Sequence, residues 1–113
     1  MTVDPFPQDW ELLWVFECEP IKADVTDIVF DSLRDKDRVL CHILPLEDEV
    51  LLSWWSEGVL RVDLKLRYVR SLEADTKDGV SALIFAFRQP GLMPLKIQFR
   101  PAISFEWGTN WYP

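Results

Sequence analysis

The chain has 113 residues, a length that suits one compact domain, 1–113, with enough residues to bury a hydrophobic core without metal or disulfide support. Apolar residues make up 49% and charged residues 27% of the chain, a balance that argues against intrinsic disorder. The formal net charge of −7 disfavours non-specific binding to nucleic acid or to an anionic membrane, so we expect neither as a partner.

In the N-terminal half, the residue pattern predicts two strands, and one segment between them fits either a strand or a helix. Residues 10–18, WELLWVFEC, are rich in aromatic and branched side chains and predict a strand. Residues 21–38 fit two descriptions: a β-hairpin over 25–44 is favoured, and a short helix capped by Asp24 is the alternative. Residues 38–45, RVLCHILP, are apolar on both faces and predict an interior strand that ends at the proline.

The C-terminal half alternates more regularly. Residues 50–56 predict a strand, and Ser-Glu-Gly at 56–58 predicts a tight reversal. Residues 60–68 place Leu, Val, Leu, Leu and Tyr on one face and charged side chains on the other. Residues 80–88 predict a further strand, and so do residues 95–100, which Pro101 interrupts before the pattern continues over 102–107. We therefore expect a mainly β fold: an antiparallel sandwich, barrel or strongly curved sheet of six to eight strands, with room for one short helix.

The tandem tryptophans of the 50–56 strand must point to opposite faces. Trp54 shares a strictly apolar face with Val50 and Leu52, so it is the predicted core residue. Trp55 lies on the mixed face and is predicted to be wholly or partly exposed, where an indole forms a contact surface. The alternative is that a second layer of the fold covers Trp55.

Charge is distributed unevenly along the chain. Residues 1–57 carry 14 acidic and 4 basic side chains, whereas residues 58–113 carry 5 acidic and 8 basic ones. This asymmetry predicts an acidic face that docks on a basic partner. The alternative is that the charges serve solubility and that their distribution is accidental.

The sequence has no recognisable catalytic or metal-binding motif. His42 is the only histidine, and its neighbour Cys41 points the opposite way in a strand, so the two do not form a nucleophile–base pair. Cys18 and Cys41 are expected to be reduced thiols in apolar segments. We expect no metal, no cofactor and no enzymatic activity. The N-terminus does not resemble a signal peptide, so the expected location is the cytoplasm.

Closely spaced carboxylates beside the tryptophan pair give the predicted partner-binding site. Carboxylates and an aromatic side chain can anchor the arginine or lysine side chains of a partner. The alternative is an ordinary solvated loop. The predicted residues are Glu47, Asp48, Glu49, Trp55 and Glu57.

Trp107, Trp111 and Tyr112 form a second aromatic group near the C-terminus. Flat aromatic faces stack on sugar rings, so these residues suggest a carbohydrate-binding platform. The competing interpretation is that the terminus folds back and covers an apolar edge of the β-layer.

The short chain, its net acidity and its tryptophan-rich segments DWELLWVFECE, EDEVLLSWWSEG and ISFEWGTNWYP resemble small bacterial immunity proteins of contact-dependent or polymorphic toxin systems. The resemblance implies a non-enzymatic inhibitor that binds one toxin domain and blocks its active site or an adjacent surface. Two other functions remain open on the sequence alone. They are a small-ligand or carbohydrate-binding β-domain and a structural or assembly protein.

Overall fold

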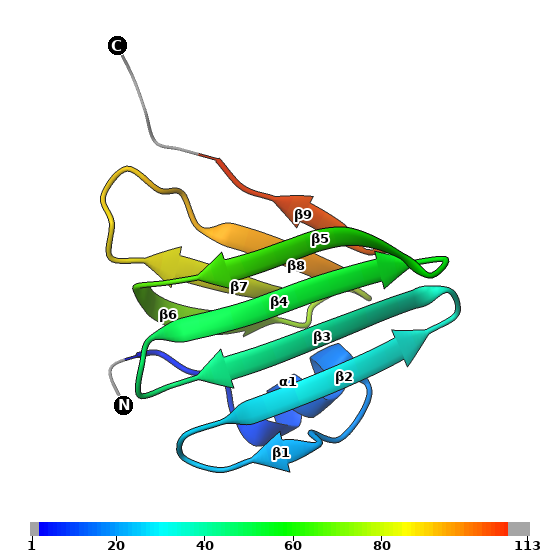
Figure 1. The fold of residues 1–113 in the computed structure, drawn as a ribbon, viewed down its shortest axis with the longest axis horizontal. Helices are drawn as coiled ribbons and strands as arrows, with labels where there is room; N and C mark the ends of the chain where they lie inside the picture. Colours follow the sequence, from blue (N-terminus) through cyan, green and yellow to red (C-terminus); the bar gives the residue numbers. More distant parts are fainter. Residues whose placement is uncertain (1–2, 109–113) are drawn as a thin grey trace.

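The structure is a computed structural model that describes residues 3–108, in which nine strands form two antiparallel sheets and one helix packs against them (Figure 1). In chain order the elements are α1 (Asp9–Phe16), β1 (Lys22–Ala23), β2 (Ile28–Arg34), β3 (Asp37–Leu44), β4 (Glu49–Ser56), β5 (Val59–Leu66), β6 (Val69–Asp75), β7 (Ser81–Phe87), β8 (Leu95–Arg100) and β9 (Ser104–Glu106).

The sheets have the orders β1-β2-β3-β4-β5 and β6-β7-β8-β9, so strands that pair are consecutive in the sequence, and the chain passes from the first sheet to the second between β5 and β6. The predicted mainly β, antiparallel fold is confirmed, and the sandwich is the correct form among the three expected. The described residues hold one strand more than the predicted maximum of eight. The short edge strands β1 and β9, of two and three residues, account for the excess.

The strand predicted at residues 10–18 is wrong, because the segment forms helix α1. The backbone N–H of Gln8 donates to the Glu11 carboxylate at 2.9 Å and caps the first turn. Glu17 ends the helix with a left-handed φ of 56°. Leu12, Val15 and Phe16 are buried at helical spacing, whereas Trp14 is exposed. Apolar residues occur at almost every position here, so the sequence concealed this helical period.

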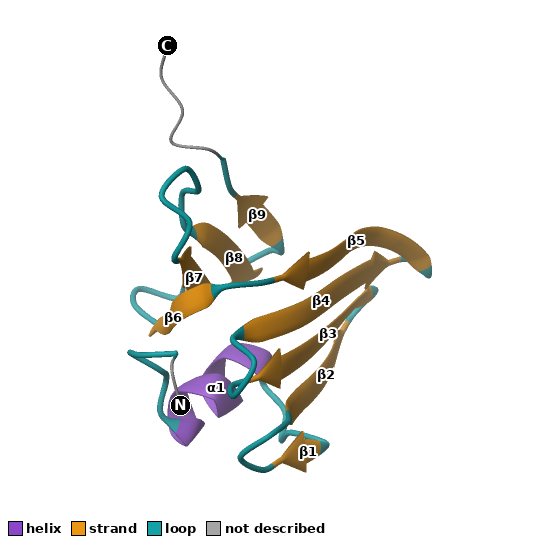
Figure 2. Cartoon of the chain, turned by 60° about the vertical axis from the view of Figure 1, so that its left-hand side comes forward, coloured by secondary structure: helices purple, strands orange, loops and turns teal. Residues whose placement is uncertain are grey.

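Helix α1 lies between the two sheets on the side where β2 and β6 diverge (Figure 2). The Phe16 ring stacks on Phe30 of β2 with centroids 4.4 Å apart, and meets Phe99 of β8 edge-on at 5.1 Å. The Phe16 carbonyl also accepts a 2.7 Å hydrogen bond from the buried Ser32 hydroxyl. The helix therefore closes one side of the sandwich and contacts both sheets.

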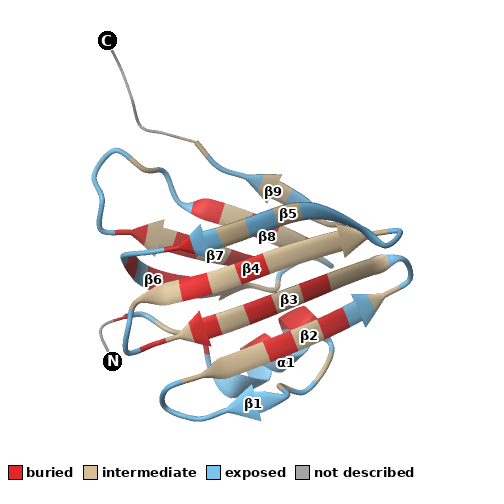
Figure 3. Ribbon diagram, in the orientation of Figure 1, coloured by how far each residue is buried: buried red, intermediate tan, exposed pale blue. Residues whose placement is uncertain are grey.

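The ambiguous segment 21–38 contains strand β2 and the start of β3, so the favoured hairpin is confirmed and the helix alternative is wrong. Arg34 pairs with Asp37 across a two-residue turn, in which Asp35 has a φ of 52°. Along β2, β3 and β4, buried side chains alternate with partly exposed ones (Figure 3). This alternation defines an inner face against the second sheet and an outer face toward solvent.

A register shift between Trp54 and Trp55 changes the face assignment at the start of β5. Trp54 pairs with Val62, but Trp55 pairs with Leu60, so Arg61 is the extra residue of a β-bulge. Directly paired residues share a face, and Leu60 therefore joins Trp55 on the outer side. Leu60 is 49% exposed, which corrects its expected place on the core face.

Candidate functional site

The predicted acidic residues lie at opposite ends of β4. Glu47 and Asp48 belong to the turn before the strand and Glu49 is its first residue, whereas Glu57 follows its last. An eight-residue strand spans about 26 Å at about 3.3 Å per residue. The structure therefore brings Glu57 close to Trp55, but it separates both from the other three carboxylates.

At the turn before β4, two of the three carboxylates face basic side chains. Asp48 Oδ2 lies 2.8 Å from an Arg88 guanidinium nitrogen, and the Asp48 side chain is only 14% exposed. Glu49 is 3.7 Å from Lys65. The Asp48 carbonyl also accepts the Val69 N–H at 3.0 Å, which ties this turn to the second sheet. Glu47 is exposed and is the carboxylate of this turn that points most openly to solvent.

At the opposite end, Glu57 and Gly58 form the reversal into β5, with φ angles of 53° and 76°. The reversal predicted at 56–58 is confirmed. The Glu57 carboxylate lies 3.9 Å from Lys36, and both side chains are well exposed. A pair with this geometry contributes little to stability, so Glu57 can exchange Lys36 for a partner's cation.

The tandem tryptophans face opposite sides, as predicted. Trp54 packs against the core, stacks on Phe105 of β9 at 5.6 Å, and donates its indole N–H to Asp37 at 2.9 Å. Trp55 is partly exposed on the outer face, where the Arg38 guanidinium lies 4.9 Å from its ring centroid. No second layer covers Trp55 within the described residues.

Arg38 is fixed above Trp55 by a bidentate ion pair with Asp31. Its Nε and one terminal nitrogen each donate to an Asp31 carboxylate oxygen at 2.9 Å. These hydrogen bonds lower the pKa of Asp31 below its usual value. The outer face therefore presents a stacked aromatic–guanidinium pair beside Glu57, and the aromatic ring already has a cation within the chain.

A groove lies beside α1, and the sequence did not predict it. It has a volume of about 690 Å³ and runs between the helix, the segment 19–25, β2 and the turn at 45–46. We call it the helix groove. Its apolar lining includes Leu12, Leu13, Val25, Ile28, Phe30 and Leu46, and its acidic lining consists of Asp9, Glu19 and Asp24. The groove could not be predicted while residues 10–18 were assigned to a strand.

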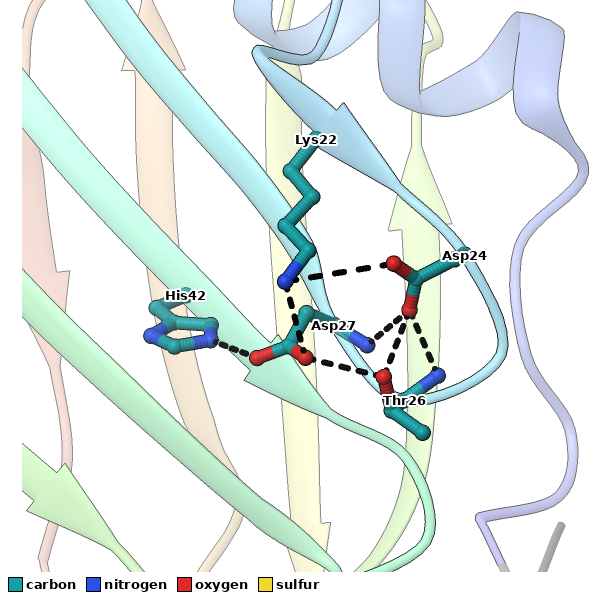
Figure 4. Close-up of polar contacts among 5 residues, drawn as sticks. All are labelled: Lys22, Asp24, Thr26, Asp27 and His42. Carbon is teal, nitrogen blue, oxygen red and sulfur yellow. Dashed lines mark hydrogen bonds and ion pairs between the residues drawn. The ribbon is translucent and has the colours of Figure 1, made fainter.

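A polar cluster holds the β1–β2 turn on the outer side of this region (Figure 4). Asp24 Oδ1 accepts bonds from the Thr26 hydroxyl at 2.6 Å and from the Thr26 and Asp27 N–H groups at 2.9 Å each. The Thr26 bonds lower the pKa of Asp24 to about 2. The Thr26 hydroxyl oxygen also lies 2.9 Å from one Asp27 carboxylate oxygen, and the other Asp27 oxygen lies 2.6 Å from His42 Nε2. This network fixes the segment that forms one wall of the helix groove.

The predicted C-terminal aromatic group is described only in part. Trp107 is 43% exposed, donates its indole N–H to the Met93 carbonyl at 3.0 Å, and tilts against Phe87 with centroids 5.7 Å apart. Trp111 and Tyr112 lie outside the described residues. Trp107 therefore packs against Phe87 of β7 while part of its surface stays exposed.

The two cysteines and the one histidine pack against, or hydrogen-bond to, other groups of the chain. Cys18 and Cys41 are free thiols, and complete burial raises the pKa of Cys41 to about 12. His42 lies partly exposed on the outer face, where its Nε2 is 2.6 Å from the Asp27 carboxylate. No group of three or more potential metal ligands occurs within residues 3–108. In the same range, no helix is long and apolar enough to span a bilayer.

No model of a known protein family matches the sequence, and no curated protein is similar to it. One solved structure has the same fold: a chain of a contact-dependent growth inhibition toxin–immunity protein complex from Klebsiella pneumoniae 342. The two chains align with a TM-score of 0.83 over 96% of this chain and 99% of the other, at 16% sequence identity. The neighbour comes from the type of toxin system whose immunity proteins this sequence resembles.

Proposed function

We propose that this protein is an immunity protein that binds a cognate toxin domain and blocks its action. The likeness of the whole fold to a chain of a toxin–immunity complex carries the proposal. The match extends over nearly the full length of both chains, so it is not a likeness of one shared motif. The net charge of −7 adds independent support, because an acidic protein is attracted to a basic surface on a partner.

The immunity role is favoured over the toxin role by the chemistry of the reactive side chains. Cys41 is fully buried and its pKa is raised to about 12, so it remains a thiol at neutral pH. His42 is held by Asp27 in the turn network. Inhibition by occupancy needs no reactive group in the inhibitor, whereas an enzyme-like toxin would need one. We place this activity in the cytoplasm and regard it as non-enzymatic.

Glu47, Asp48, Glu49, Trp55 and Glu57 are the proposed toxin-contacting residues. A standard interface covers about 800 Å² on each partner, which is a patch roughly 30 Å across. The two ends of β4 are about 26 Å apart, so one interface of this size can include both. Glu47 and Glu57 are exposed and supply electrostatic attraction, and Trp55 supplies an aromatic contact.

Growth measurements test the proposal. A candidate toxin domain, sought among the products of the neighbouring genes, is expressed from an inducible promoter, with and without this protein. We expect growth arrest by the toxin alone, normal growth on co-expression, and no arrest by this protein alone. Isothermal titration of the purified pair should then give a defined stoichiometry. Growth arrest caused by this protein alone would reverse the assignment, and unprotected arrest on co-expression would exclude it.

A further inference from the structure

The helix groove combines open apolar surface with a defined shape. Leu13 is 39% exposed, Val25 78% and Leu46 58%, and all three contribute to the lining. They come from α1, the β1–β2 turn and the β3–β4 turn, so no single element presents this surface. Its volume of about 690 Å³ lies within the range of sites that bury large apolar groups. Exposed aliphatic side chains that converge on one hollow mark a contact surface.

The charged residues that line the helix groove are all acidic. Asp9, Glu19 and Asp24 are exposed and line it, and no lysine or arginine belongs to its lining within the described chain. Lys22 lies outside the lining, 3.9 Å from Asp24 and 3.4 Å from Asp27, and its side chain is 55% exposed. Low-dielectric walls beside like charges concentrate a negative potential in such a hollow. The groove therefore favours an occupant with apolar anchors and positive charge.

The groove also adjoins part of the predicted acidic site. Leu46 lines it and Glu47 is the next residue of the same turn, so this exposed carboxylate extends the negative region toward β4. The walls are fixed: Phe16 joins α1 to β2 by ring stacking, and Asp24 and Asp27 hold the β1–β2 turn. A fixed site loses little conformational freedom on binding.

We propose that the helix groove is the docking site for a cationic amphipathic segment of a protein partner, with aliphatic or aromatic side chains in the hollow and lysine or arginine facing Asp9, Glu19 and Glu47. The identity of that partner as the toxin rests on the proposed function. The binding chemistry does not, since it follows from the shape and charge of the groove.

A short fluorescein-labelled peptide with leucines at helical spacing among lysines is the probe, and fluorescence anisotropy is the measurement. The matched peptide replaces every lysine with glutamate. We expect the wild-type protein to bind the lysine peptide at least roughly tenfold more tightly than the glutamate peptide at low salt. Equal binding of the two peptides, or no binding of the lysine peptide, would overturn the proposal.

Charge insertion locates the binding site. Val25→Lys places a cation at the groove, and we expect it to weaken binding of the lysine peptide roughly tenfold. Leu33→Lys is the matched control: Leu33 is 74% exposed on β2 outside the groove lining, and the change in net charge is the same. Circular dichroism checks that both variants fold. Equal losses in the two variants would show non-specific attraction and would sink the proposal.

The toxin assay separates this inference from the proposed function. If wild-type protein protects cells and Val25→Lys does not, the groove is the toxin contact. If wild-type protein fails to protect while the groove still discriminates between the peptides, the immunity role is wrong and the docking chemistry stands. If Val25→Lys protects as well as wild type, the segment docks elsewhere and the inference about the toxin is wrong.

Discussion

Each end of β4 has an apolar side chain and an exposed carboxylate, Trp55 with Glu57 at one end and Leu46 with Glu47 at the other. The two ends differ in whether these side chains already contact a cation within the chain. At the C-terminal end of β4, the Trp55 ring lies under the Arg38 guanidinium, and Glu57 faces Lys36. At the other end, Leu46 and Glu47 are exposed and continue into the helix groove. An aromatic ring with an internal cation gains less from a partner's cation. The comparison teaches that neighbours, rather than residue type alone, decide which surface is available for binding.

The first prediction concerns the two tryptophans at the end of β4, which should differ most in their effect on stability. Trp54→Ala removes a core contact, the Phe105 stack and the hydrogen bond to Asp37, so we expect a loss of about 3 kcal/mol in the free energy of unfolding. Trp55→Ala removes an exposed cation–π contact and should cost less than about 1 kcal/mol. Urea denaturation followed by circular dichroism measures both. Similar losses would show that Trp55 is also structural.

The second prediction concerns Arg100, which attaches α1, one wall of the helix groove, to the second sheet. Arg100 donates to the buried Ser81 hydroxyl at 2.6 and 2.9 Å, to the Trp14 carbonyl at 3.2 Å, and pairs with Glu17 at 2.9 Å. It thereby joins the end of α1 to the second sheet. Arg100→Ala leaves a buried hydroxyl without these donors and should destabilise the protein by about 2 kcal/mol.

Lys36→Ala is the control for Arg100→Ala, since it also removes a cation that faces a carboxylate. The Lys36–Glu57 pair is exposed and 3.9 Å long, so this change should cost less than about 0.5 kcal/mol. Chemical denaturation compares the two variants. Hydrogen exchange should also show faster exchange in α1 for Arg100→Ala. Unchanged protection of α1 would mean that packing of Phe16 alone holds the helix.

The third prediction compares the carboxylates at the two ends of β4 in partner binding. Glu47→Lys places a cation beside the groove, so we expect a loss of affinity for the toxin of roughly tenfold, about 1.4 kcal/mol. Glu57→Lys makes the same charge change next to Lys36 and should reduce affinity only about twofold. Isothermal titration at two salt concentrations measures both. A larger effect at Glu57 would move the main contact to the Trp55 end.

Most of the strands could be predicted because strand side chains alternate between two faces every second residue, a pattern that a few neighbouring residues are enough to show. Along β8, Leu95, Ile97 and Phe99 are buried between partly exposed polar neighbours, and sequence alternation alone identifies such a strand. The same reasoning placed Trp54 inward and Trp55 outward. It failed at Leu60, because the bulge opposite Trp55 is a property of the pairing and not of either strand alone.

The helix and the groove show why the rest could not be predicted. In residues 10–16 apolar side chains occupy both the buried positions Leu12 and Val15 and the exposed positions Trp10 and Trp14. Neither a strand nor a helix period stands out in such a segment. The cap formed by Gln8 and Glu11 was the one local signal for a helix. The groove joins residues from three separate elements, so it appears only once the fold is known.

The last and smallest effect concerns the acid sensitivity of the groove wall. The folded-state pKa of Asp24 is about 2, below its usual 3.8, mainly because the Thr26 hydroxyl donates to the carboxylate. A lowered pKa means that the charged form stabilises the native state above about pH 4, and that this contribution is lost as the pH falls from about 4 to about 2. Asp27, whose pKa is lowered chiefly by its bond with His42, should act in the same direction. Asp24→Asn keeps an oxygen that accepts the Thr26 and Asp27 N–H groups but does not titrate. The urea midpoint of the wild type should therefore fall more steeply with acid than that of Asp24→Asn, and parallel curves would show that Asp24 serves the turn only as a neutral acceptor.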